Sequence, residues 1–292
     1  MVRKVRISTI SMYLPDGITK LEENVDRAFD AINEALTYHP DIICLPEDYT
    51  VFCSSKEDIV KSIDMADEIN NKIQQLAIKG KCYIISTILT RRKEGVYNSA
   101  FIIDRKGEII GKYDKTHLAP KEHNLYGNIP GNNFPVFETD FGKIAVMICM
   151  DIHYVEVARI YGVKGVEILF WPTQTYDPSE DFIITLLRSR AMDNQMYVVA
   201  SNFCKVPYYP GKEFGRACIV GLDGKILADT GNRPAIATTD IDLDEQMRLD
   251  WSFTGEQSEA LTKQFPDLKT VTYRTRRPNL YKILGEEIHE KR

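Results

Sequence analysis

Three segments of the sequence end an apolar run with a reactive or charged side chain. Glu47 follows the run in DIICLPE, Lys115 follows the run in EIIGKYDK, and Cys149 follows the run in KIAVMIC. Active sites of α/β folds gather at strand ends and in the loops beyond them, so these side chains are the first candidates for chemistry. A core cysteine would sit equally well in mid-strand, whereas a thiol at the strand tip faces whatever lies beyond the sheet edge.

The segments around these residues alternate between strand-like and helix-like patterns. Strands are predicted for VRISTISMYL, DIICLPE and CYIISTIL, and after Cys149 for EILFWP and MYVVASN. Helices are predicted for residues 20–39, 56–80, 154–162 and 180–194. Gly80 is a typical C-terminal stop for the second helix.

Two hairpin-like stretches, AFIIDRKGEII (100–110) and ACIVGLDGKIL (217–227), align without a gap. Each has a glycine where the turn needs one. Unless the likeness is coincidental, the chain has two similar halves, each with two βα units and a hairpin. We expect one α/β domain over residues 1–250, a four-layer α-β-β-α sandwich. Residues 251–292 lack a clear period and are expected to form an extended tail that packs on the domain or on a partner subunit.

Composition excludes several classes of protein. The chain has 292 residues, enough for a sizeable core, and 37 basic and 42 acidic side chains give a net charge of −5. The densest basic cluster, RTRRP (274–278), is too short to indicate nucleic acid, and no apolar run reaches the roughly 18 residues of a membrane span. The six cysteines form no CxxC pair, which argues against disulfides and zinc and for a reduced, cytoplasmic protein.

The motifs LPED, YDKTHL and ICMDIHYVEVAR resemble those of the carbon–nitrogen hydrolases of the nitrilase superfamily. RSRAMDNQMYVVASN (188–202) and RRPNLY (276–281) are similar to further motifs of that family, so the resemblance covers nearly the whole chain. It implies the nitrilase-type sandwich, a hydrolase that needs no metal and no cofactor, and a homodimer or higher homo-oligomer. The apolar helix VEVARIYGV and the aromatic tail suit such an interface.

The resemblance assigns the catalytic Glu-Lys-Cys triad of the family to Glu47, Lys115 and Cys149. A free thiol with a pKa of about 8.5 is only a few per cent thiolate at neutral pH, so it needs a base or a nearby cation. Glu47 would take the thiol proton and later activate water, and Lys115 would stabilise the oxyanion beside the backbone N–H of Met150.

Family members often carry a second glutamate between the lysine and the cysteine, and Glu122 is the candidate here. The alternative interpretation of Glu122 is an exposed loop carboxylate next to Lys121. The substrate-binding residues are expected around the cysteine and after the strand EILFWP, although Trp171 also fits an ordinary core position. They are Met150, Asp151, His153, Trp171, Thr173, Gln174 and Tyr176.

The leading hypothesis is a cytoplasmic amidase or N-carbamoyl amidohydrolase that cleaves a small linear substrate through a cysteine thioester. Asp151 resembles the amide-cleaving branches, and a nitrilase is therefore the second choice. A Cys-His hydrolase with His117 or His153 as base would leave Lys115 and Glu47 without a role. A non-catalytic binding protein that kept the fold is the alternative from another class. The only expected partners are the substrate and further copies of the chain.

Overall fold

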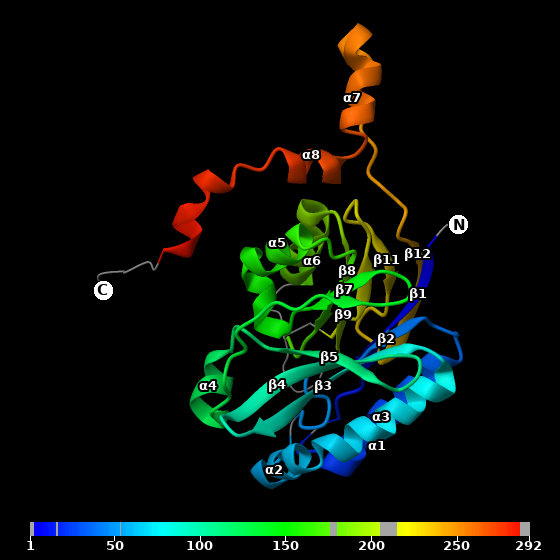
Figure 1. The fold of residues 1–292 in the computed structure, drawn as a ribbon. Helices are drawn as coiled ribbons and strands as arrows, with labels where there is room; N and C mark the ends of the chain where they lie inside the picture. The colour runs from blue at the N-terminus through cyan, green and yellow to red at the C-terminus, as the bar shows by residue number, and fades with distance from the viewer. Residues whose placement is uncertain (1–2, 16, 53, 176–179, 205–214, 287–292) are drawn as a thin grey trace. The chain divides into compact units, whose positions relative to one another are not determined.

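The computed structural model describes residues 3–15, 17–52, 54–175, 180–204 and 215–286 (Figure 1). The chain divides into two compact units, Met1–Asp244 and Glu245–Arg292. No helix in the described ranges is both long and apolar enough to cross a membrane.

The strands of the first unit belong to two halves with the same order. In the described part of the chain they are β1 (Lys4–Met12), β2 (Ile42–Cys44), β3 (Tyr83–Arg92), β4 (Gly95–Ile103), β5 (Ile109–Asp114), β6 (Phe137–Glu138), β7 (Lys143–Val146), β8 (Ile168–Pro172), β9 (Tyr197–Phe203), β10 (Cys218–Val220), β11 (Ile226–Asp229) and β12 (Ala235–Asp242). The first half runs β12-β1-β2-β3-β4-β5 and the second runs β6-β7-β8-β9-β10-β11. In both, the central three strands are parallel and the outer ones antiparallel. The halves join where the end of β1 pairs with the end of β9.

The two hairpins share the same irregularity in strand register. The register of β4 and β5 shifts between Ile102 and Ile103, and that of β10 and β11 shifts between Ile219 and Val220, which is the aligned position. Gly107 and Gly224 both adopt left-handed backbone conformations, with φ of 79° and 78°. The prediction of two similar halves is confirmed.

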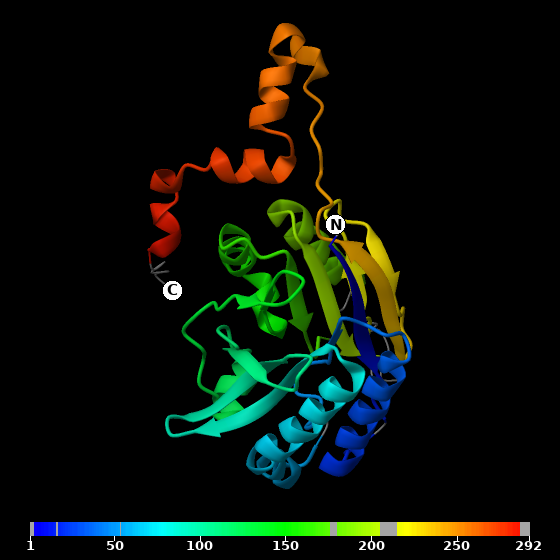
Figure 2. The ribbon, with the colours of Figure 1, turned by 45° about the vertical axis from the view of Figure 1, so that its right-hand side comes forward.

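Helices cover the outer face of each half (Figures 1 and 2). They are α1 (Leu21–Leu36), α2 (Lys56–Asp64) and α3 (Ala66–Gly80) in the first half, α4 (Pro120–Tyr126) after β5, and α5 (Val155–Val163) and α6 (Glu180–Asn194) in the second half. Ile43 and Ile84 pack against α1 and α3, whereas Leu169 and Val198 pack against α5 and α6. The intervening residues, such as Ile85 and Phe170, are also fully buried, so the two sheets pack on each other.

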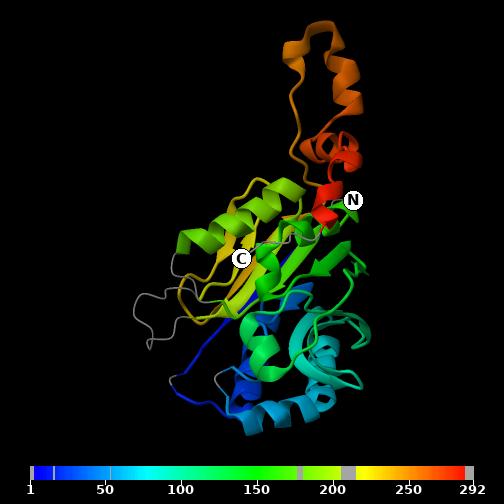
Figure 3. The same cartoon turned by 90° about the vertical axis from the view of Figure 1, so that its left-hand side faces the viewer.

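The four-layer α-β-β-α sandwich is therefore confirmed, and the side view shows α1 to α3 in blue and cyan on one half and α5 and α6 in green on the other (Figure 3). One predicted helix was wrong. Residues 56–80 form two helices that break at Met65, and the acidic Asp67 and Glu68 lie in the first turn of the second helix, where negative charge is favourable. The second helix ends at Gly80 as predicted, but the left-handed residue is Lys81, with φ of 50°. A Cβ at Gly80 would collide with Leu36 of α1.

The second unit contains short helices rather than a wholly extended tail. They are the 3-10 helices η2 (Ser252–Gln257), η3 (Pro278–Leu280) and η4 (Lys282–Gly285), and the α-helices α7 (Ser258–Gln264) and α8 (Leu268–Arg274). Asp267 caps α8 by accepting from the Thr270 N–H at 2.7 Å, and Trp251 Nε1 donates to the Phe265 carbonyl at 2.8 Å. Local capping and turns formed these helices, which is why no hydrophobic period marked them in the sequence.

Candidate active site

Cys149 occupies a sharp turn where the apolar run after β7 meets the 3-10 helix η1 (Cys149–His153). Its φ of 43° is left-handed, which is uncommon for a residue with a side chain and stores strain at the reactive group. The carbonyl of Cys149 accepts a hydrogen bond from Trp171 Nε1 at 2.8 Å, and its sulfur lies 3.5 Å from Thr175 Oγ1. The turn directs the thiol out of the strand and its carbonyl into the core.

Glu47 extends from the loop that follows β2, and three groups fix its carboxylate. Oε1 accepts hydrogen bonds from Lys115 Nζ at 2.7 Å and from Asn98 Nδ2 at 2.8 Å. Oε2 accepts from the backbone N–H of Gln174 at 2.9 Å, and the Gln174 side chain donates to the Glu47 carbonyl at 3.1 Å. Glu47 is thereby held at the point where the loop after β2 meets the loop after β8.

Lys115, at the end of β5, lies between two glutamates. Its Nζ is 2.7 Å from Glu47 Oε1 and 2.6 Å from Glu122 Oε2, and the Lys115 side chain is only 1% exposed. Glu122 lies in the first turn of α4, where Oε2 also accepts from the Ala119 N–H at 2.7 Å. Glu122 is buried, so the structure does not support the alternative of an exposed loop carboxylate.

Burial and mutual charge set the protonation of these groups. Burial, and then the charge of Glu47, raise the pKa of the Cys149 thiol to about 11, although Lys115 opposes the shift. Burial raises the pKa of Glu47, with Lys115 acting against burial and Glu122 adding to it. Burial works against the charge of Lys115, but Glu47, Cys149 and Glu122 outweigh it and hold the pKa of Lys115 well above its usual range. These shifts favour a neutral thiol at Cys149 and a charged ammonium at Lys115, 2.7 Å from the Glu47 carboxyl group.

Asp151 connects the lysine segment to the cysteine turn. It is fully buried, and its Oδ2 accepts from the Tyr113 hydroxyl at 2.6 Å and from the Ile148 N–H at 2.8 Å. Its Oδ1 accepts from Thr116 Oγ1 at 3.0 Å and from the His117 N–H at 3.0 Å. Both oxygens are thus engaged with protein donors on either side of the site.

The family model of the carbon–nitrogen hydrolases matches residues 5–248, a range that contains Glu47, Lys115 and Cys149. The chain belongs to the carbon–nitrogen hydrolase family. The family resemblance of the motifs is therefore confirmed, and so is the assignment of the chain to this class of hydrolase.

Similar proteins cover most of this carbon–nitrogen hydrolase. The 2-oxoglutaramate amidase of Bacillus subtilis (strain 168) is 32% identical over 237 residues, which span 79% of this chain and 88% of that protein. Omega-amidase NIT2 of Homo sapiens is 29% identical over 234 residues, 76% of this chain and 83% of that one. A carbon–nitrogen hydrolase from Helicobacter pylori G27 shares the fold, with a TM-score of 0.80, 23% identity, and coverage of 98% of this chain and 99% of that one. An amidase from Nesterenkonia sp. has a TM-score of 0.75, 19% identity, and coverage of 96% of both chains.

Two of the predicted substrate-binding residues lie in the protein interior. Asp151 and Trp171 are fully buried, and their polar atoms bind protein groups next to Cys149. The sequence could not show this, because a carboxylate that follows a nucleophile looks the same whether it faces substrate or core. In this hydrolase both residues are placed to support the cysteine turn.

The other predicted contacts are distributed around the turn. Thr173 is buried and its hydroxyl contacts that of Thr175, while Gln174 is half-buried and reaches Glu47. Met150 is half-buried, His153 is exposed and stacks on Phe182 with 6.0 Å between ring centroids, and Tyr176 lies outside the described residues. Substrate contact by Met150, His153, Thr173 and Gln174 stays a prediction.

Sequence reasoning missed several residues of the site. Asn98 on β4 donates from one amide to Glu47, to Glu122 at 3.1 Å and to Asp48 at 3.3 Å. The signal for Asn98 was a polar residue within the strand VYNSAFII, where burial without a partner would be costly. Thr175, beside the sulfur, carried no signal. Arg190 lies in α6, and its Nε and Nη2 donate hydrogen bonds to the Ile152 carbonyl at 3.1 and 2.7 Å. These bonds connect η1 to α6.

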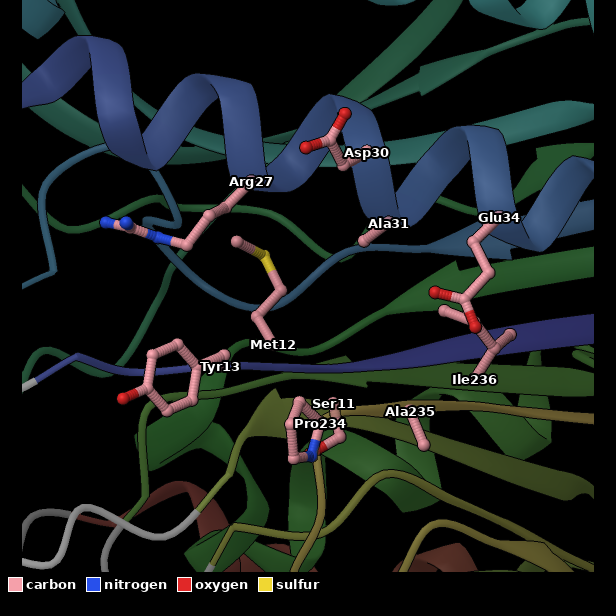
Figure 4. Close-up of a pocket in the computed structure, with 10 residues that line it drawn as sticks. All are labelled: Ser11, Met12, Tyr13, Arg27, Asp30, Ala31, Glu34, Pro234, Ala235 and Ile236. Carbon is pink, nitrogen blue, oxygen red and sulfur yellow. The ribbon is translucent and has the colours of Figure 1, made fainter.

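A cluster of carboxylates lies at this site, and a cavity lies apart from it. Ligand atoms of Glu47, Asp48 and Glu122 lie within 4.8 Å of one another, but the Lys115 ammonium already pairs with two of these carboxylates, which makes the set a poor metal site. A separate cavity of about 190 Å³ lies between α1 and the β1–β12 pair (Figure 4). Its lining combines charged and apolar side chains and includes none of the residues around Cys149; they are Ser11, Met12, Tyr13, Arg27, Asp30, Ala31, Glu34, Pro234, Ala235 and Ile236.

Proposed function

We propose that this carbon–nitrogen hydrolase cleaves the C–N bond of a small linear amide or N-carbamoyl compound through a thioester on Cys149. The observation that carries the proposal is the convergence of Glu47, Lys115 and Glu122 from three separate segments beside a strained cysteine. The relatives support an amide as the substrate class, since they are named as an omega-amidase and a 2-oxoglutaramate amidase.

In the first half of the reaction, Cys149 Sγ attacks the carbonyl carbon while its proton passes to Glu47. General-base assistance is needed because a thiol with a pKa of about 11 supplies almost no thiolate at neutral pH. Two of the three N–H groups of Lys115 bind glutamates, so the third is available to the oxyanion, together with the Met150 N–H. Glu47 then protonates the leaving nitrogen, the C–N bond breaks, and the thioester remains.

In the second half, water attacks the thioester carbon and gives its proton to Glu47. Lys115 again stabilises the oxyanion, the C–S bond breaks, and the proton returns from Glu47 to the sulfur as the carboxylic acid departs. Glu47 thus transfers a proton four times in one cycle, twice as a base and twice as an acid, and the Gln174 N–H and Asn98 hold it in one orientation throughout. Glu122 has a supporting role, because it fixes the Lys115 ammonium and the start of α4.

Ammonia release tests the proposal directly. The purified protein is incubated with small neutral amides, ω-amides of dicarboxylic acids such as 2-oxoglutaramate, N-carbamoyl amines, N-carbamoyl amino acids and nitriles, beside Cys149→Ala. We expect release from amides or N-carbamoyl compounds that disappears in the variant, and an acyl adduct on the Cys149 peptide by mass spectrometry after rapid quenching. Release from nitriles alone would replace the amidase by a nitrilase. Activity that survives in Cys149→Ala would remove the cysteine from the mechanism.

We further propose a cytoplasmic homodimer. The cysteines within the described ranges are free thiols, which suits a reducing compartment; they are Cys44, Cys82, Cys149, Cys204 and Cys218. The outer layer of the second half exposes apolar side chains on α5 and α6: Val155 is 56% exposed and Val163 48%, and Phe182 and Met192 are exposed as well. Large exposed apolar side chains on two neighbouring helices suit burial against a second copy.

A further inference from the structure

A third carboxylate adjoins the two that bind Lys115. Asp48 directly follows Glu47 and is only 8% exposed. Carboxylate oxygens of Glu47, Asp48 and Glu122 lie within 4.8 Å of one another, inside the first unit of the fold. The mechanism derived above uses Glu47 and Glu122 but gives Asp48 no role.

Asp48 has weaker partners than either glutamate. Lys115 Nζ binds Glu47 at 2.7 Å and Glu122 at 2.6 Å, while Asp48 Oδ2 accepts a 3.3 Å hydrogen bond from Asn98 Nδ2, an amide that also donates to both glutamates. Asp48 Oδ1 is buried and has no hydrogen-bond partner among the described residues.

A charge count follows from these contacts. Three ionised carboxylates around one ammonium would leave the buried cluster with two uncompensated negative charges. Burying an unpaired charge is costly, so such a cluster takes up a proton instead. The proton goes to the carboxylate that Lys115 does not reach, as in other sites where close carboxylates share one proton.

We propose that Asp48 is held as a neutral carboxylic acid in the resting enzyme, as a positioning residue that leaves Glu47 as the ionised base next to Cys149. This inference rests on the proposed function for its catalytic consequence, although the protonation itself does not. The pKa of Asp48 agrees, because burial, then the charges of Glu47 and Glu122, hold it well above its usual range against the opposing Lys115.

The groups around Asp48 come from four segments. Glu47 adjoins it in the loop after β2, Lys115 faces it from the end of β5, Glu122 from α4, and the uncharged Asn98 from β4. An ionised Asp48 would add a second like charge beside Glu47 and would oppose the thiolate and the oxyanion that form during catalysis. Loss of the Asp48 proton at alkaline pH should therefore lower kcat/KM.

The backbone of Asp48 determines the best variant. Its φ of 45° is left-handed, a conformation that asparagine tolerates better than most residues. Asp48→Asn has the shape of the neutral acid and cannot ionise. Asp240→Asn is the matched control, because Asp240 is an exposed aspartate that pairs with Arg6 at 2.6 Å, and this hydrogen bond lowers its pKa.

Infrared difference spectroscopy at neutral pH tests the protonation without any substrate. We expect the wild type minus Asp48→Asn spectrum to show the carbonyl band of a protonated carboxylic acid, and the Asp240→Asn spectrum to show only carboxylate bands. A spectrum in which Asp48→Asn also removes only carboxylate bands would overturn the proposal. Carboxyl-13C-aspartate labelling of the wild type tests the proposal even if Asp48→Asn fails to fold, because the absence of any protonated aspartate band at neutral pH would overturn it.

The catalytic consequence has its own readout. In a protein that hydrolyses an amide, we expect the alkaline limb of the kcat/KM profile to move to higher pH in Asp48→Asn, because the variant has no proton to lose at position 48. We expect a movement of about one pH unit or more, which is the common spread of side-chain pKa values in folded proteins. An unmoved limb, or a 100-fold loss of kcat/KM at neutral pH, would show that Asp48 is not a neutral acid that titrates in this range. Absence of hydrolysis from every compound would contradict the proposed function and leave the infrared result standing.

Discussion

Lys115 and Glu47 form a 2.7 Å ion pair in which both side chains are almost completely buried, at 1% and 4% exposed. Glu122 adds a second carboxylate to this ion pair, with its Oε2 2.6 Å from the same ammonium. Removing one member of a buried ion pair is far more costly than exchanging the whole pair for apolar groups, because the other charge is left without compensation. In the proposed mechanism, stability and catalysis are therefore coupled at Lys115.

We expect Lys115→Met to abolish hydrolysis and to lower the free energy of unfolding by about 3–5 kcal/mol at neutral pH, because Glu47 and Glu122 lose their cation. Urea denaturation measures the stability. Lys112→Met, at an exposed position of β5, is the control and should change it little. The loss should shrink at acidic pH, where the glutamates of the variant take up protons.

Lys115 makes the stability of the wild type depend on pH, in the direction expected for a lysine whose pKa is raised by folding. The stabilisation from Lys115 is fully present below its unfolded pKa and is lost as pH rises through its folded pKa. A Lys115→Met protein as stable as the wild type at neutral pH would contradict the ion-pair assignment.

The thiol and its base can be separated experimentally. The pKa of Cys149 is raised to about 11 by burial and then by the charge of Glu47, so alkylation by iodoacetamide should still rise with pH well above the range of a free thiol. Glu47→Gln removes one of the raising charges. It should speed alkylation at mildly alkaline pH, yet lower kcat/KM by roughly 10²–10⁴ because the general base is gone.

Mass spectrometry of the Cys149 peptide gives the alkylation rate, and Glu108→Gln, an exposed change near the start of β5, is the control. Slower alkylation together with slower catalysis in Glu47→Gln would mean that Glu47 activates the thiol in the resting state as well. The present geometry, in which Lys115 and Asn98 hold the carboxylate, predicts that the two rates change in opposite directions.

Oligomeric state is the third prediction. Val155 and Val163 lie at opposite ends of α5 with about half of each side chain exposed. We expect Val155→Asp and Val163→Asp to convert a dimer into monomers in analytical ultracentrifugation, since a charge buried in an apolar interface lacks a partner. Val60→Asp on α2, which is 50% exposed in the other half, should leave the dimer intact. A wild-type monomer at micromolar concentration would contradict the proposed dimer.

The sequence predicted the framework well where hydrophobic periodicity controls structure. Each predicted strand was found, and the aligned hairpins proved to have the same register shift, because short-range patterns determine both. The break at Met65 was missed since the apolar spacing of α2 continues into α3. Whether a periodic stretch is one helix or two depends on packing against other elements, which a local pattern does not contain.

The candidate site was predictable only in part, for a similar reason. The positions of Glu47, Lys115 and Cys149 at strand ends mark them from the sequence, and the family resemblance names them. Asn98 and Asp48 joined the candidate site only in the structure, where the Asn98 amide donates to Glu47 and to Asp48, which lie 51 and 50 residues away along the chain. Such contacts follow from the order of strands in the sheets rather than from spacing along the chain.

The last prediction concerns the link between the lysine segment and the cysteine turn. In Asp151→Asn the amide N–H₂ must face either Tyr113 and the Ile148 N–H, or Thr116 and the His117 N–H, and both sides already donate. At least one buried donor then has no acceptor, so we expect a loss of about 1–3 kcal/mol in urea denaturation. The kcat should fall as well, because Ile148 precedes the nucleophile.

Tyr113→Phe is the matched comparison, since it removes one donor to Asp151 and creates no conflict. We expect it to cost only about 0.5–1.5 kcal/mol and to leave most of the activity. If Asp151 instead contacted substrate, Asp151→Asn would raise KM while stability stayed near that of the wild type. A fall in kcat together with a fall in stability, at unchanged KM, is the result expected from a side chain that positions Cys149 from inside the fold.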